Sequence, residues 1–177
     1  MKPLTKNTIE RFLKIAMSKL KGKWVLIGGA LLPILGISKR TTIDIDIVGP
    51  KDLGVTGQLE LLKIAQELDL PIEAINQAAN FFLWKIKDWD KMITPLYESK
   101  KITIFRPTVT LFLLLKINRL TELDLSDCLD FIRYADEHNE PLDKKRVLTA
   151  IQNALREDPL KEKLERLQIL QRRIKEL

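Results

Sequence analysis

Residues 27–48 read IGGALLPILGISKRTTIDIDIV, and this stretch decides the fold of the first half of the chain. A Gly-Gly pair stands near its start, and residues 42–48 alternate polar and apolar side chains in strict period two. Because successive side chains of a strand point to opposite faces, the alternation predicts a strand with Asp44 and Asp46 on one face and the isoleucines on the other. The stretch therefore predicts the end of one strand, a glycine turn, a short helix and a second strand.

The segments on either side extend this pattern to a mixed half of helices and strands. Apolar spacing and breaker residues predict helices over residues 7–20, 30–35 and 57–70. Short apolar runs rich in strand formers predict further strands over residues 24–27, 81–86 and 101–105. Residues 71–75 are compatible with either a strand or an irregular turn, while Asp88 and Asp90 have the pattern of a helix start.

Beyond residue 108 the sequence shows helical patterns and no further strand signal. Turn residues separate four amphipathic segments, at residues 110–120, 126–138, 143–156 and 160–177. We therefore predict an α+β fold, in which residues 1–107 form a mixed sheet flanked by helices and residues 108–177 form a helical C-terminal subdomain. The leucine stripe of the last segment is suited to pack on the preceding helices or on a second subunit.

The composition describes a chain long enough to bury one core. It has 177 residues, 45% of them hydrophobic and 31% charged, with a formal net charge of +6. Such a charge favours anionic partners such as triphosphates or RNA, although solubility alone is an equally good reason for it. The single cysteine, Cys128, cannot form an intramolecular disulfide. Together with spaced rather than continuous apolar residues at the N-terminus, this leads us to expect a cytoplasmic protein with no membrane span.

The aspartate pair and the glycine pair suggest a site for a metal and a phosphate. Asp44 and Asp46 supply the carboxylate oxygens that Mg²⁺ prefers, and phosphoryl transfer depends on such a cation. Gly28 and Gly29, at the exit of a strand, would let the main chain approach a phosphate closely. Either feature by itself is common on protein surfaces, but their order within about twenty residues favours a site over surface decoration.

These residues resemble a known family. The stretch at 27–48 looks like the signature of the DNA polymerase β-type nucleotidyltransferase superfamily, in which a glycine turn precedes paired metal aspartates. Residues 110–132, TLFLLLKINRLTELDLSDCLDFI, are similar to the bacterial branch related to abortive-infection toxin nucleotidyltransferases. In that branch a helix bearing a lysine precedes an arginine and an acidic pair, and the matching residues here are Lys116, Arg119, Asp124 and Asp127.

The resemblance implies roles for individual residues. Asp44 and Asp46 would ligate Mg²⁺ and act in catalysis, and Lys116 would contact a phosphate or orient an acid. The side chains and turn that would hold the NTP are Gly28, Gly29, Arg40, Thr42 and Lys116. Catalytic members generally add a third carboxylate on a neighbouring strand, for which Glu73 has suitable spacing, with Asp88 and Asp90 as alternatives.

The residues themselves leave alternatives open at the second motif. Lys116 lies in a strongly apolar helix, where it would either extend to solvent or, if buried, need a carboxylate or phosphate partner. Asp124 and Asp127 would serve equally well as helix caps. Trp24, Trp84 and Trp89 fit a core better than a surface for stacking bases.

The expected function is a Mg²⁺-dependent nucleotidyltransferase that moves an NMP from an NTP to a hydroxyl of RNA, such as tRNA, or of protein. The resemblance also implies a toxin-like role, with a second copy or an antitoxin bound through the C-terminal helices. The alternative is a module of the same fold that binds nucleotide or a partner without efficient transfer.

Overall fold

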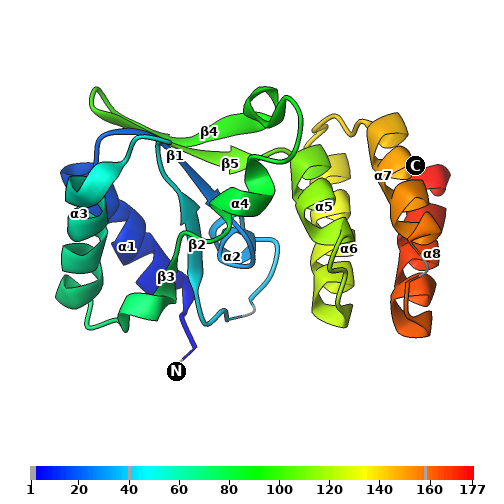
Figure 1. The fold of residues 1–177 in the computed structure, drawn as a ribbon, viewed down its shortest axis with the longest axis horizontal. Helices are drawn as coiled ribbons and strands as arrows, with labels where there is room; N and C mark the ends of the chain where they lie inside the picture. The colour runs from blue at the N-terminus through cyan, green and yellow to red at the C-terminus, as the bar shows by residue number, and fades with distance from the viewer. Residues whose placement is uncertain (1–2, 40, 158) are drawn as a thin grey trace. The chain divides into compact units, whose positions relative to one another are not determined.

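A mixed sheet organises the first part of the chain. In the computed structural model, which describes residues 3–39, 41–157 and 159–177, five strands lie in the order β3-β2-β1-β5-β4 (Figure 1). The strands are β1 (Gly22–Ile27), β2 (Ile45–Val48), β3 (Ile75–Asn76), β4 (Ile93–Glu98) and β5 (Ile102–Pro107). β1 is antiparallel to β2 and parallel to β5, β2 is parallel to β3, and β4 is antiparallel to β5.

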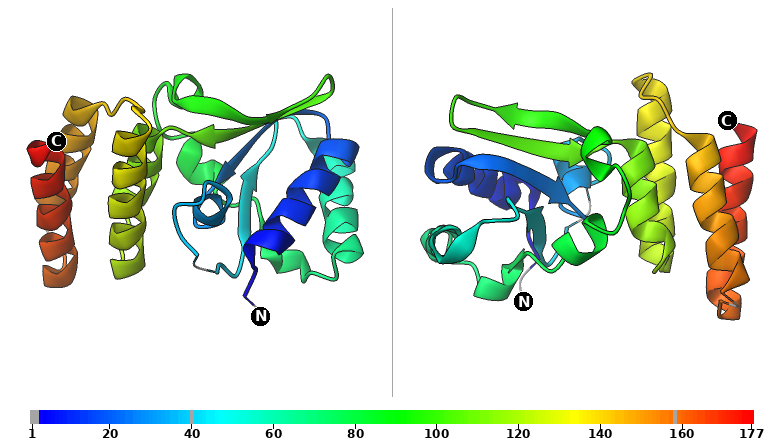
Figure 2. Two further views of the ribbon diagram at one scale, coloured as in Figure 1. Left: turned by 180° about the vertical axis from the view of Figure 1, so that it is seen from behind. Right: turned by 45° about the horizontal axis from the view of Figure 1, so that its top comes forward.

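The two faces of this sheet differ in character. Trp24, Ile45 and Ile47 lie on a fully buried face. Helices α1 (Lys6–Lys19) and α3 (Gly54–Glu67) contact each other, and both views in Figure 2 place them side by side. Their apolar residues join the same core, which gains roughly 25 cal/mol of stabilising free energy per Å² of apolar surface taken from water. The opposite face carries Asp46 next to the buried Val25 and Val48.

The predicted boundaries around the aspartates need a correction. β2 begins at Ile45, so Asp44 precedes the strand rather than lying on it. Ile43 is exposed, in contrast to Ile45 and Ile47, which are buried as the alternation predicts. Pairing of β2 with β1 stops at Asp46 and its pairing with β3 stops at Ile45, so neither ladder reaches Asp44. Helix α2 (Leu31–Ile34) lies between the two strands as predicted.

Two segments of the sheet region depart from the sequence prediction. Residues 81–86 were expected as a strand, but α4 (Asn80–Leu83) and a following turn occupy this part of the chain. A short apolar run does not by itself distinguish a strand from a helical turn. β4 was not predicted, because Pro95 interrupts its pattern. The structure accommodates that proline on an edge strand, beside an irregular register at Tyr97.

Residues 71–75, for which the sequence allowed either a strand or an irregular turn, contain a short 3₁₀ helix and the start of a two-residue strand. The 3₁₀ helix η1 (Ile72–Ala74) leads directly into β3, and a second one, η2 (Trp89–Lys91), follows α4. The helix start predicted from Asp88 and Asp90 therefore corresponds to η2, with Asp88 in the left-handed region at φ 54°.

Among its described residues the second part of the chain forms helices joined by short loops and no strand, as predicted. Its helices are α5 (Val109–Ile117), α6 (Glu122–Glu137), α7 (Lys144–Arg156) and α8 (Lys161–Glu176). α8 contacts both α6 and α7, and its apolar stripe is buried at Leu167, Leu170 and Ile174. The leucine stripe therefore packs on the preceding helices of this unit.

The chain divides into two compact units, Met1–Pro107 and Thr108–Leu177. The fold is α+β, with a mixed sheet and helices in the first unit and helices in the second. Among the described residues, no helix combines the length and the apolar character needed to cross a bilayer.

Candidate functional site

The glycine turn lies directly against one of the two aspartates. Ile27, the last residue of β1, pairs with Asp46 of β2, and Gly28 follows it with φ +72°. A Cβ atom at Gly28 would lie 2.1 Å from Oδ2 of Asp46, which is far inside van der Waals contact. Glycine is required here for two reasons, because the backbone is left-handed and because the carboxylate occupies the space of a side chain.

The turn itself is closed by its own backbone. The amide of Leu31 donates to the carbonyl of Gly28, and the amide of Leu32 donates to that of Gly29, both at 3.4 Å. Those long bonds leave the turn weakly held by the main chain. Its position therefore depends on the pairing of β1 with β2 and on the contact with Asp46.

Asn76 holds the carboxylate of Asp46 from the neighbouring strand. It is the residue of β3 that pairs with Asp46, and its Nδ2 donates to Oδ1 of Asp46 at 2.7 Å. The Oδ1 of Asn76 accepts from the backbone amide of Ala78 at 2.9 Å, which fixes the orientation of its amide group. Asn76 was not predicted, since its place opposite Asp46 follows from strand pairing across thirty residues of sequence.

Asp44 is held by a different support. The hydroxyl of Thr42 donates to Oδ1 of Asp44 at 3.0 Å. Thr42 is itself buried and pairs through its backbone with Leu4 in an isolated bridge. Thr42, which the resemblance implies to bind the NTP, thus positions Asp44 in this structure. Both aspartates are half-buried.

The structure does not bring the expected third carboxylate to this pair. Glu73 lies in η1 and is exposed, so it precedes the strand on which that acid was expected. Asp88 and Asp90 are at η2, beyond α4. Among the described residues, no group of three or more His, Cys, Asp or Glu side chains gathers in a way that could hold a metal ion. The strand position opposite Asp46 belongs instead to Asn76. Arg40, expected at the phosphates, lies outside the described residues.

The second motif forms an ion cluster inside the helical unit. Lys116 is 7% exposed, and Asp124 and Asp127 are 1% and 2% exposed. Nζ of Lys116 lies 2.6 Å from Oδ1 of Asp124 and 3.3 Å from Oδ2 of Asp127. Of the two alternatives at Lys116, the structure therefore shows burial with carboxylate partners. Its ammonium meets two acids of its own unit, the arrangement that a buried cation needs.

Asp124 is the centre of this cluster. Arg119 donates to it with two nitrogens at 2.8 Å each, and Thr121 completes a capping box at the start of α6. Burial opposes ionisation of the Asp124 carboxyl, but hydrogen bonds from Arg119 and Lys116 outweigh it, so that its pKa lies well below the usual range. The capping role considered for Asp124 from the sequence is thus present, together with the ion pairs.

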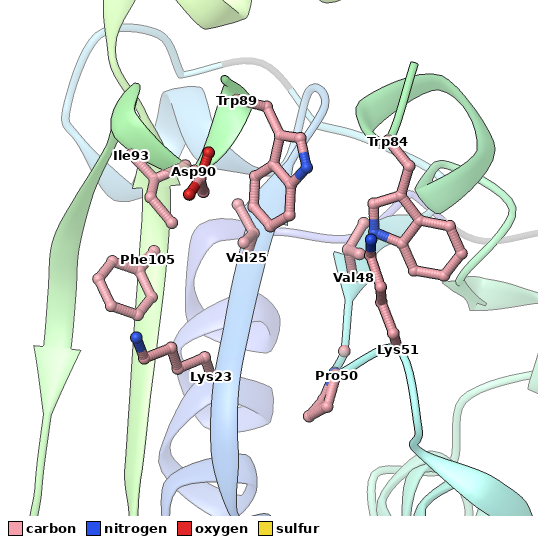
Figure 3. Close-up of a pocket in the computed structure, with 11 residues that line it drawn as sticks. Lys23, Val25, Val48, Pro50, Lys51, Trp84, Trp89, Asp90, Ile93 and Phe105 are labelled. Atoms are coloured by element: carbon pink, nitrogen blue, oxygen red, sulfur yellow. The ribbon is translucent and has the colours of Figure 1, made fainter. Parts of the chain in front are cut away.

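The tryptophans differ in ways that the sequence did not predict. Trp24 is a core residue, 1% exposed, as expected. Trp84 is 38% exposed, and with Trp89 it lines a cavity of about 260 Å³ on the first unit (Figure 3). Residues 80–91, NFFLWKIKDWDK, interleave aromatic and basic side chains, and that pattern is the sequence signal that could have found them.

Comparisons of this chain with protein-family models, with curated proteins and with solved structures return no match.

Proposed function

We propose that the first unit carries a binding site for Mg²⁺ and a nucleotide. We propose further that the protein is a nucleotidyltransferase, which moves an NMP from an NTP to a hydroxyl of RNA or protein. The observation that carries the proposal is the contact between Gly28 and the carboxylate of Asp46. It joins a turn able to admit a phosphate to an acid able to hold the cation of that phosphate. A toxin-like role with an antitoxin partner follows from the resemblance in sequence only.

The donor set suits magnesium. Mg²⁺ in nucleotide sites is usually held by one or two carboxylates and completes its octahedron with substrate phosphates and water. Asp44 and Asp46 are half-buried and are each oriented by a hydrogen bond, from Thr42 and from Asn76. When bound, the ion would neutralise charge on the triphosphate and favour in-line displacement.

The reaction balances without a further reactant. The oxygen of the acceptor hydroxyl forms a bond to the α-phosphorus, and the bond from that phosphorus to the bridging oxygen breaks. Pyrophosphate leaves, and the hydroxyl proton passes to a carboxylate or to water. The chain contributes position and charge, which supply most of the catalysis in phosphoryl transfer.

The direct test is transfer of label from an α-labelled NTP to cellular RNA or protein, with Mg²⁺ and with EDTA. Replacing both aspartates, Asp44→Asn with Asp46→Asn, should lower the rate by at least about 100-fold, since the developing charge loses its stabilisation. Asp69→Asn is the matched control, because Asp69 is an exposed acid at the end of α3 with φ 53°, which asparagine also tolerates. Unchanged transfer in the double variant would remove the assignment.

A second candidate keeps the site and drops efficient transfer. It is favoured by Asn76, which stands opposite Asp46 where a third carboxylate would complete a two-metal cage. Such a module would be stabilised by Mg-NTP, by about 2.7 kcal/mol at a ligand concentration 100 times the dissociation constant, with no label transferred. Thermal unfolding with each NTP tests binding, which both candidates require, and label transfer separates them. The absence of any shift together with absent transfer would contradict both.

A further inference from the structure

The cavity of the first unit lies on the same face of the sheet as Asp46. Val25 pairs with Val48, and two residues along the strands Ile27 pairs with Asp46. Side chains two residues apart on a strand share a face and are separated by about 7 Å. Val25 and Val48 line the cavity, so it begins one side-chain step from the proposed metal carboxylate. In Figure 3 helix α1 lies behind the sheet and the tryptophans lie in front of it.

The walls of this cavity are aromatic. Trp84, which follows α4, and Trp89, which opens η2, stand over the floor formed by the two valines (Figure 3). Phe105 of β5 lines the cavity as well. A folded chain normally buries a ring as large as that of Trp84, so the exposure of Trp84 at a cavity points to a ligand with a flat apolar surface.

Cations stand at the edge of the same cavity. Nζ of Lys51 lies 5.7 Å from the centre of the Trp84 ring, and Figure 3 shows its side chain reaching toward that ring. Lys23 of β1 also lines the cavity, as does one acid, Asp90. Aromatic rings bordered by lysines are the combination with which proteins bind nucleobases and their phosphates without reading sequence.

We propose that this cavity binds the base of a nucleotide by stacking on Trp84 and Trp89, with the attached phosphate near Lys51. The inference deepens the proposed function, because it names a binding site beside Asp46 for one of the two reactants. Its volume of about 260 Å³ lies below the range of about 300 to 1,000 Å³ that encloses drug-sized ligands, and suits one ring system with its phosphate left outside. The base can belong to a free NTP or to an unpaired residue of an RNA strand.

Tryptophan fluorescence tests the proposal directly, with EDTA present so that the metal site is silent. The four NTPs, tested one by one, form the first arm of the experiment. A single-stranded oligoribonucleotide and the corresponding duplex form the second arm. Stacking should quench Trp84 and Trp89, while Trp24, buried on the other face, keeps its emission. Quenching by NTPs identifies the free nucleotide, and tighter binding of the single strand identifies RNA. Equal binding of duplex and single strand without quenching by any NTP, or no quenching by any of these ligands, would overturn the proposal.

Variants measure the stacking itself. Trp84→Leu should weaken binding of the effective ligand by about 5-fold to 150-fold, and Trp84→Phe should restore most of it. Tyr97→Leu is the matched control, since Tyr97 is 39% exposed, lies on β4 and does not line the cavity. Should Trp84→Leu fail to fold, Lys51→Gln replaces an exposed side chain. That variant should make the slope of log affinity against log salt concentration shallower by about 0.7, the value for one phosphate of a single strand that the lysine no longer neutralises.

The same variants separate this proposal from the proposed function. Quenching in the parent protein, together with no label transfer by that same parent protein, would uphold the cavity and reject the transferase. Label transfer at an unchanged rate and unchanged KM in Trp84→Leu would uphold the transferase and reject the cavity.

Discussion

Two pairs of aspartates, one in each unit, share a sequence spacing of only a few residues but have different surroundings. Asp44 and Asp46 are half-buried, and described hydrogen bonds to them come from a hydroxyl and an amide. Asp124 and Asp127 are almost fully buried, and both are bonded to the ammonium of Lys116. The first pair keeps part of its surface in solvent, whereas the second is buried against a cation of the chain itself.

This difference teaches how burial assigns a carboxylate its role. A buried acid must be compensated inside the protein, because transfer of its charge from water is costly. Asp124 has that compensation from Lys116 and from the paired nitrogens of Arg119. A half-buried acid oriented by Thr42 or Asn76 keeps access to solvent. Burial and pairing therefore give the second pair a role in stability, and the ligand binding that we propose concerns the first pair.

The largest expected effect is on the buried pair. Lys116→Met should lower the free energy of unfolding by about 3 to 5 kcal/mol, because two buried carboxylates lose their shared ammonium. Denaturant unfolding of the intact chain measures it. Lys63→Met is the control, since Lys63 pairs with Glu60 on the surface of α3 and should change stability by less than about 1 kcal/mol. Equal losses in the two variants would break the comparison.

The next largest effect concerns the glycine turn that lies against Asp46. Gly28→Ala and Gly36→Ala both place alanine at a positive φ, +72° and +74°, and should share a cost of about 1 to 2 kcal/mol. Gly28→Ala should lose a further 1 to 3 kcal/mol or so, because its methyl group meets Asp46, while a Cβ at Gly36 meets nothing within 4 Å. Thermal unfolding of both variants gives the difference, and Mg-NTP should stabilise Gly36→Ala but not Gly28→Ala.

A third change adds another carboxylate next to Asp46. Asn76→Asp removes the amide that donates to Asp46 and sets two carboxylates face to face. In EDTA the variant should lose about 1 to 3 kcal/mol of stability, and Mg²⁺ should restore it, since a divalent cation relieves the repulsion. Asn153→Asp, at an exposed position of α7, serves as the control. If Mg²⁺ fails to stabilise Asn76→Asp, the aspartates do not form a magnesium site.

The smallest expected effect is on the free energy of unfolding at acidic pH. The folded-state pKa of Asp124 lies below its unfolded value, so the cluster contributes fully above about pH 4 and loses that contribution as pH falls further. The loss for this one carboxyl cannot exceed about 1.4 kcal/mol per pH unit. Unfolding free energies at several pH values should show Asp124→Asn approaching the parent protein as pH falls. A constant gap from pH 7 to pH 3 would contradict the assignment, and Asp130→Asn, at a half-buried position of the same helix that pairs with Arg133, is the control.

Prediction from sequence succeeded where a pattern is local and long. The four C-terminal helices repeat their apolar spacing over several turns, so their type and order follow from the chain itself. Prediction failed where the apolar pattern is short, and where the pairing of strands determines the structure. Residues 81–86 are apolar enough for a strand but form α4 and a turn, and β4 holds Pro95 because it is an edge strand.

The candidate site shows the same division. Asp44, Asp46 and Gly28 were predicted from one continuous stretch, and strand pairing places Gly28 against Asp46. Asn76 was not predictable, because nothing in its local sequence marks it as the partner of an acid thirty residues away. The expected role of Glu73 rested on spacing along the chain, which does not determine what lies side by side in a sheet.

By itself, the sequence determined the class of the fold, the period-two burial of Ile45 and Ile47 and the presence of two acids next to a glycine turn, because these depend on neighbours along the chain. Only the tertiary structure decided which acids keep part of their surface in solvent and which are buried against a cation of the chain. The difference depends on burial and on partners that strand pairing and helix packing bring together. Asn76 donates to Asp46 from the neighbouring strand, and Lys116 donates to Asp127 from the preceding helix.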